Sequence, residues 1–72
     1  MNAELPAERL NELAADALEI SRRCSNLAQF HYSRGETREA IYAEQAQHSS
    51  RRYAEILTER ADAAVKAQAA GA

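Results

Sequence analysis

Two histidines and one carboxylate are the side chains best suited to bind a metal ion. Glu44 and His48 are four residues apart, so on a helix they lie one turn apart on the same face, the spacing that two ligands of one metal need. A metal centre inside a helical bundle also needs Glu-x-x-His pairs and further inward carboxylates. The sequence has no Glu-x-x-His pair, so we predict no metal and no cofactor. We expect His48 to face solvent and His31 to lie near a turn.

Cys24 is the single cysteine of the chain, so no internal disulfide can form. It lies between Ile20 and Leu27 in an apolar pattern, where a thiol fills space like a small apolar side chain. A catalytic cysteine needs a base beside it and access to solvent, and we expect neither histidine opposite Cys24. We therefore predict that the chain is not an enzyme and that it belongs in a reducing compartment.

Arginines and tyrosines gather in the middle of the chain. Residues 21–53 carry six arginines against three glutamates, whereas residues 1–20 carry five acids against one arginine. Arginine beside tyrosine can bind phosphates and stack on bases, and it is also typical of hot spots in protein interfaces. Because acids are interleaved with these arginines and the net charge is −2, we favour a protein partner. The predicted partner-binding residues are Phe30, Tyr32, Arg34, Arg38, Tyr42 and Arg52.

A heptad pattern predicts the helix of the first half of the chain. Apolar residues alternate at spacings of three and four, which is typical of a helix that packs one narrow seam against another helix. The predicted seam consists of Leu10, Leu13, Ala17, Ile20, Cys24, Leu27 and His31. Pro6 suits a first helical turn, Gly35 can end a helix in the left-handed conformation, and Thr37 can cap the next helix. We predict a helix over about 6–33, a turn over about 34–37 and a helix over about 38–69.

A fold at Gly35 places the two predicted helices antiparallel to each other. Residues whose numbers add up to about 70 then lie side by side, so that large side chains meet small ones, for example Leu27 and Ala43. This alternation fills space between close helices and favours a hairpin over one continuous rod. The predicted packing residues of the second helix are Ala43, Ala46, Tyr53 and Leu57.

The sequence around this turn resembles the core of one tetratricopeptide repeat. The likeness rests on Leu27-Ala28, Gly35 and Glu39-Ala40-Ile41, where small residues before and after the turn let two helices pack closely. It covers about 20 residues without a second copy, whereas such repeats stack in groups of at least about three. The resemblance implies a tight helical hairpin, and we interpret it as a similar local packing rather than as membership of the family.

Length and composition predict one all-α domain over residues 1–72. Alanine dominates the apolar 46% of residues and strand formers are sparse. A chain this short closes its core with difficulty. A lone hairpin leaves uncovered Leu18, Phe30, Tyr32, Tyr42 and whichever of Ile56 and Leu57 does not face Leu13. We predict that two hairpins pair antiparallel into a four-helix bundle, with each basic turn beside the acidic ends of its mate.

These patterns predict a small non-enzymatic protein–protein interaction module, acting as a regulator, inhibitor or co-chaperone in the form of a homodimer. The alternative is a nucleic-acid-associated regulator that uses the same basic turn end. The sequence has no basic start followed by an apolar run, and no stretch approaches the roughly 18 apolar residues that cross a bilayer. We therefore expect no membrane association and a cytoplasmic location.

Overall fold

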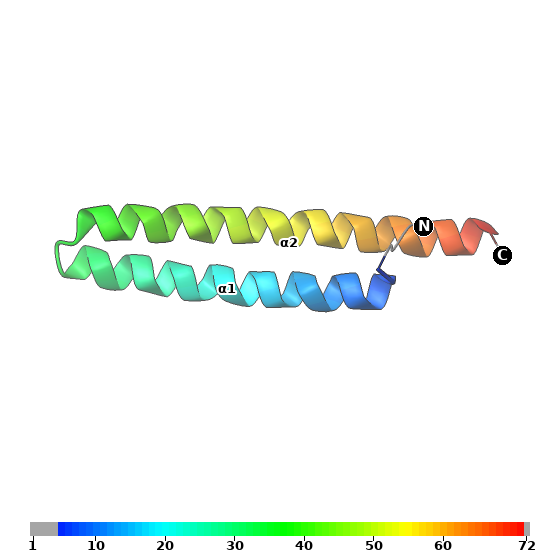
Figure 1. Cartoon of the computed structure of the whole chain (residues 1–72), viewed down its shortest axis with the longest axis horizontal. Coiled ribbons are helices and arrows are strands. Elements are labelled where there is room, and N and C mark those ends of the chain that lie inside the picture. The colour runs from blue at the N-terminus through cyan, green and yellow to red at the C-terminus, as the bar shows by residue number, and fades with distance from the viewer. Residues whose placement is uncertain (1–4, 72) are drawn as a thin grey trace.

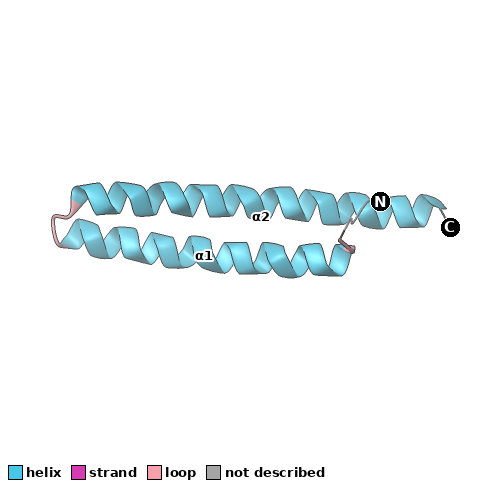
Figure 2. Ribbon diagram, viewed as in Figure 1, coloured by secondary structure: helices cyan, strands magenta, loops and turns pink. Residues whose placement is uncertain are grey.

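Two long helices run antiparallel and form a hairpin (Figure 1). The computed structural model describes residues 5–71, in which α1 spans Ala7–Ser33 and α2 spans Thr37–Gly71. These residues contain no strand, as Figure 2 shows, so the prediction of an all-helical fold is confirmed. The hairpin measures 56 × 20 × 13 Å. It is therefore one helix thick, and both of its broad sides are open to solvent.

Pro6 determines where α1 begins. Its backbone is extended (φ −64°, ψ 155°), and its carbonyl accepts the N–H of Leu10 at 3.0 Å, so it occupies the N-cap position. Glu8 lies in the first turn, where a carboxylate interacts favourably with the positive end of the helix dipole. The helix thus begins one residue later than predicted.

Gly35 ends α1 in a Schellman motif. Its φ of +74° lies in the left-handed region, which a residue without Cβ adopts at no steric cost. The Gly35 N–H donates to the Tyr32 carbonyl at 3.1 Å, and the Glu36 N–H reaches back to the His31 carbonyl at 2.9 Å. These two bonds satisfy carbonyls that the end of a helix leaves open, and they fix the length of the turn.

Glu36, rather than the predicted Thr37, occupies the N-cap position of α2. The Glu36 carbonyl accepts the N–H of Ala40 at 3.0 Å, so the first helical bond already begins there. Consequently α2 begins at Thr37, one residue earlier than predicted, and it ends at Gly71, two residues later than predicted. It extends past α1 at the end opposite the turn (Figure 1).

The two helices pack along a seam of small side chains. The buried residues are Leu10, Ala14, Ala17, Ser21 and Ala28 on α1 and Ala40, Ala54, Leu57 and Ala61 on α2. Only two of them are large, and Ala40 and Ala61 are 0% and 1% exposed. The Ser21 hydroxyl crosses the seam and donates to the backbone carbonyl of Gln47 at 3.0 Å. A side chain as short as serine reaches the backbone of the other helix because the helices lie close together.

On each helix, alternate positions of the seam lie one residue later than predicted, which corresponds to a partial rotation of the helix. Leu10, Ala17 and Leu57 are buried as expected, and Cys24 and Ala43 are half-buried. Four predicted packing residues, Ile20, Leu27, Ala46 and Tyr53, are instead exposed, and Leu13 is only partly buried.

The reason for this correction is steric. On α1 a small residue directly follows each of Leu13, Ile20 and Leu27. These small residues, Ala14, Ser21 and Ala28, are buried in the seam instead of the large ones. Both sets recur every seven residues, so the heptad pattern is compatible with either. The smaller set lets the helices approach, whereas side chains the size of leucine in the same space would force them apart.

Enlarging a seam residue tests this arrangement. We expect Ala14→Leu to lower the free energy of unfolding by about 1–3 kcal/mol, because Ala14 is buried and the added atoms separate the helices. Ala15→Leu, one residue along on an exposed position, should change it by less than about 0.5 kcal/mol. Urea unfolding followed by circular dichroism at one fixed protein concentration measures both values. Equal losses in the two variants would contradict the seam.

Candidate interaction surface

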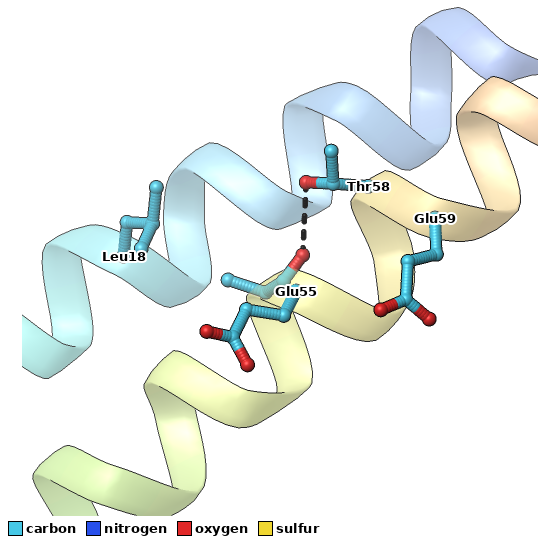
Figure 3. Close-up of a pocket in the computed structure, with 5 residues that line it drawn as sticks. Leu18, Glu55, Thr58 and Glu59 are labelled. Atoms are coloured by element: carbon cyan, nitrogen blue, oxygen red, sulfur yellow. Dashed lines mark hydrogen bonds between the residues drawn. The ribbon is translucent and has the colours of Figure 1, made fainter.

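Residues that directly follow a seam residue lie on one broad side of the hairpin. Tyr32 follows His31 and Glu44 follows Ala43, and the Tyr32 hydroxyl donates to the Glu44 carboxylate across the helices at 2.6 Å. Leu18 follows Ala17 and Thr58 follows Leu57, and both side chains line one shallow depression (Figure 3). Residues that directly precede a seam residue must therefore share the opposite broad side.

The side formed by residues that directly precede a seam residue is the more apolar of the two. We call it the apolar face. Its uncharged residues are Leu13, Ile20, Leu27 and Phe30 on α1 and Tyr42, Ala46, Ser49, Tyr53, Ile56 and Ala63 on α2, and the charged residues Arg9, Asp16, Arg23, Glu39 and Arg60 lie among them. Ile20 and Leu27 are each 51% exposed, and Tyr53 is 53% exposed. Large apolar side chains that lie together in solvent mark an interaction site in soluble proteins. The four exposed residues that were predicted for the seam all belong to this face.

The opposite side, which we call the polar face, carries mostly charged and polar residues, together with the exposed Leu18, Tyr32, Ile41 and Val65. The charged and polar residues include Arg22, Gln29, Glu44, His48, Arg51, Glu55 and Asp62. Its depression is lined by Leu18, Ala54, Glu55, Thr58 and Glu59 (Figure 3). The Thr58 hydroxyl donates to the Ala54 carbonyl of its own helix at 2.9 Å, so it is engaged within α2 and not directed at a ligand.

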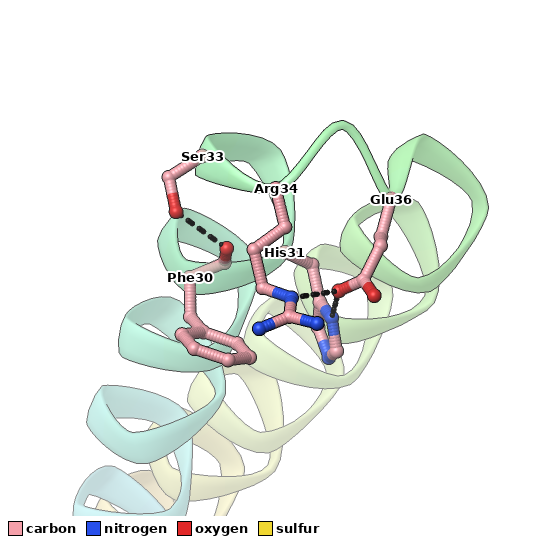
Figure 4. Close-up of polar contacts among 5 residues, drawn as sticks. All are labelled: Phe30, His31, Ser33, Arg34 and Glu36. Atoms are coloured by element: carbon pink, nitrogen blue, oxygen red, sulfur yellow. Dashed lines mark hydrogen bonds and ion pairs between the residues drawn. The ribbon is translucent and has the colours of Figure 1, made fainter.

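A cluster of ionic and aromatic contacts surrounds the turn (Figure 4). One carboxylate oxygen of Glu36 lies 2.9 Å from Nδ1 of His31 and 3.3 Å from Nε of Arg34. The guanidinium of Arg34 in turn lies 5.2 Å from the centre of the Phe30 ring, a cation–π contact, and the same ring meets His31 edge-on. Glu36 thus holds both nitrogen-bearing side chains and positions Arg34 over an exposed aromatic ring.

The six predicted partner-binding residues are exposed but do not form one patch. Phe30 and Tyr42 lie on the apolar face, and Arg34 contacts Phe30 at the turn. Tyr32 lies on the polar face, bonded to Glu44. Arg38 and Arg52 lie on the outer edge of α2, and Arg52 is ion-paired with Glu55 at 3.3 Å. The structure therefore brings Phe30 and Arg34 into contact, places Tyr42 on the same face as Phe30, and places Tyr32, Arg38 and Arg52 elsewhere.

Glu44, His48 and Cys24 are the residues that the sequence offered for metal binding or catalysis. Glu44 accepts the hydrogen bond of Tyr32, and His48 is exposed on the polar face. Cys24 is a half-buried free thiol in the seam. Within residues 5–71, no three side chains of His, Cys, Asp or Glu come together as a metal would require. Neither α1 nor α2 combines the length and the apolarity needed to cross a membrane over these residues.

Sequence reasoning missed Ser21 and Glu36, which join the two helices at the seam and at the turn. The seven-residue repeat of Ala14, Ser21 and Ala28 carries the signal for the first.

No model of a protein family, no curated protein and no solved structure matches the chain. The geometry defines its class as a helical hairpin with one apolar and one polar face.

The hydrogen bond between Tyr32 and Glu44 has a measurable consequence. The carboxylate accepts a hydrogen bond from the phenol O–H and repels the phenolate, and both effects raise the pKa of Tyr32 above its ordinary value of 10.0. We expect Glu44→Ala to lower this pKa toward the ordinary value. The control Glu39→Ala removes an exposed carboxylate elsewhere on α2 and should leave the pKa of Tyr32 unchanged. An NMR titration of the Tyr32 ring carbons measures it. An unchanged pKa in Glu44→Ala would show that the bond is absent in solution.

Proposed function

We propose that the chain is a non-enzymatic protein–protein interaction module that works as an antiparallel dimer of hairpins, a four-helix bundle, and regulates, inhibits or chaperones another protein. One observation carries this proposal. Small side chains fill most of the seam, and most of the large apolar side chains outside it lie on the apolar face. A cytoplasmic setting, in which Cys24 stays a thiol, suits this function.

The apolar face has a thermodynamic reason to be covered. The seam buries mainly alanine, which removes little apolar surface from water, and the hairpin is one helix thick. Ile20, Leu27 and Phe30 are about half exposed, so a partner that covers the rest of each side chain contributes about 0.8–1.5 kcal/mol per residue. A partner on the apolar face therefore supplies stabilisation that the seam lacks.

The distribution of charge favours an antiparallel arrangement of the two hairpins. The half of the hairpin near the turn is basic, since residues 21–53 carry six arginines and three glutamates. The open half is acidic, with Glu8, Glu12, Asp16 and Glu19 on α1 and Glu55, Glu59 and Asp62 on α2. Opposite ends attract when one hairpin is reversed against the other, whereas like ends repel when both turns lie at the same end.

Ion pairs in the basic half of the hairpin favour a protein over a nucleic acid as the further partner. Arg34 and Arg52 are paired with Glu36 and Glu55, which reduces their attraction for phosphates. The exposed contact of Arg34 with Phe30 has the composition of a hot spot in a protein interface. We therefore propose that the turn end binds a protein.

A charge placed on the apolar face tests self-association. We expect the wild-type chain to sediment with twice its mass of 8.0 kDa. Ile20→Lys should weaken the dimer at least about tenfold, because it buries an unpaired ammonium group. Ala15→Lys, which adds the same charge on the polar face, should sediment as the wild type does. A monomer mass for the wild type at micromolar concentration, with the helices intact, would contradict the dimer.

The turn end is tested by capture of proteins from a cell lysate on the immobilised chain. The double variant Phe30→Ala and Arg34→Ala should retain the captured protein at least about tenfold less, because it removes a hot spot. Since Phe30 also belongs to the apolar face, the variant should sediment with the wild-type mass, which separates loss of the turn site from loss of the dimer. The control Gln29→Ala with Arg51→Ala removes one arginine from the polar face and should retain it fully. Equal retention by both would move the partner site away from the turn. Retention that nuclease treatment abolishes would support the nucleic-acid alternative.

A further inference from the structure

We propose that the apolar face binds a second copy of this chain around a two-fold axis that crosses α1 at Ile20 and α2 at Ser49. This inference rests on the proposed function as a dimer. It adds which face forms the interface, which helix lies against which, and where the centre of the interface lies.

Two large side chains on each helix are arranged symmetrically about these two centres. On α1, Leu13 and Leu27 each lie seven residues from Ile20. On α2, Tyr42 and Ile56 each lie seven residues from Ser49. Seven residues are two turns of a coiled helix, so each set of three occupies one stripe. When such a stripe packs antiparallel against the same stripe of a second copy, its large side chains lie opposite each other. Leu13 then lies against Leu27 of the second copy.

A single axis serves both helices because the two centres lie at the same height of the hairpin. The hydrogen bond from Ser21 to the carbonyl of Gln47 joins the helices at 3.0 Å, beside Ile20 on α1 and beside Ser49 on α2. The same two-fold rotation therefore places α1 antiparallel against α1 of the second copy and α2 antiparallel against α2 of the second copy. Such an interface is isologous, and it closes with two copies.

The residues near the axis on α2 are small. Ala46 and Ser49 leave room for the second copy to approach, while Tyr53 extends from the next turn. In the reversed copy Tyr53 falls opposite Ala46, so a large side chain enters the space above a small one. This repeats between the hairpins the alternation of size that dense packing requires.

Charges on the same face also become complementary under this rotation. Asp16 and Arg23 lie on opposite sides of Ile20, four and three residues away, so each meets the other type in the second copy. Glu39 and Arg60 lie ten and eleven residues from Ser49 and exchange in the same way. An arrangement with both turns at one end instead brings the two basic turn ends together.

Disulfide formation locates the axis. In a Cys24→Ala background, Ser49→Cys places a thiol beside the axis, close to its own counterpart in the second copy. His48→Cys is the neighbouring position on the polar face, and Ala63→Cys lies on the apolar face fourteen residues from Ser49. Two Ala63→Cys thiols are separated by about 40 Å in the antiparallel dimer, far beyond the reach of a disulfide.

After mild oxidation, we expect covalent dimer from Ser49→Cys to exceed that from each of the other two variants at least about tenfold. Ile20→Cys, at the axis on α1, provides a second variant and should also form covalent dimer if Ser49→Cys does not fold. A dimer by sedimentation in which neither axis variant cross-links, or in which His48→Cys or Ala63→Cys cross-links as well, would overturn the placement while leaving the dimer intact. A wild-type monomer by sedimentation would instead remove the dimer itself.

Discussion

The close approach of α1 and α2 at Ser21 and Gln47 is the constraint on which the rest of the structure depends. A serine hydroxyl that reaches the backbone of the other helix at 3.0 Å leaves no room for a large side chain at the same height. Alanine and serine therefore occupy most of the seam, and the leucines, isoleucines and tyrosines of the same turns lie outside it. The side chains between the helices are small because the helices are close. The same closeness keeps large apolar side chains on the outside of the hairpin.

The turn fixes which residues share this close approach. The Schellman motif at Gly35 sets the number of residues between the helices, and Glu36 holds His31 and Arg34 across the turn. With the turn length fixed, the pairing of residues along the seam is fixed as well. The two broad faces follow from this pairing, because a residue just before or just after the seam has one side of the hairpin available to it.

Much of the fold was predictable from single residues, whereas the rotation of the helices was not. Pro6 and Gly35 act locally, so they located the helix ends to within one or two residues. The choice between Ile20 and Ser21 for the seam is not local. Hydrophobicity alone favours Ile20, and the advantage of Ser21 exists only once a second helix lies within hydrogen-bonding distance. The apolar face depends on the same rotation, so sequence reasoning assigned half of it to the interior.

On the proposed dimer, this rotation also makes the stability of the hairpin dependent on its partner. A seam of alanines costs little side-chain entropy to order, but it contributes little hydrophobic stabilisation. The leucines and aromatic residues that contribute more are placed where only another molecule can cover them. Formation of the hairpin and occupation of the apolar face are then linked, as in obligate dimers. Reversal of one hairpin against the other sends the two turn clusters to opposite ends of the bundle, so each dimer offers two separate sites for a further partner.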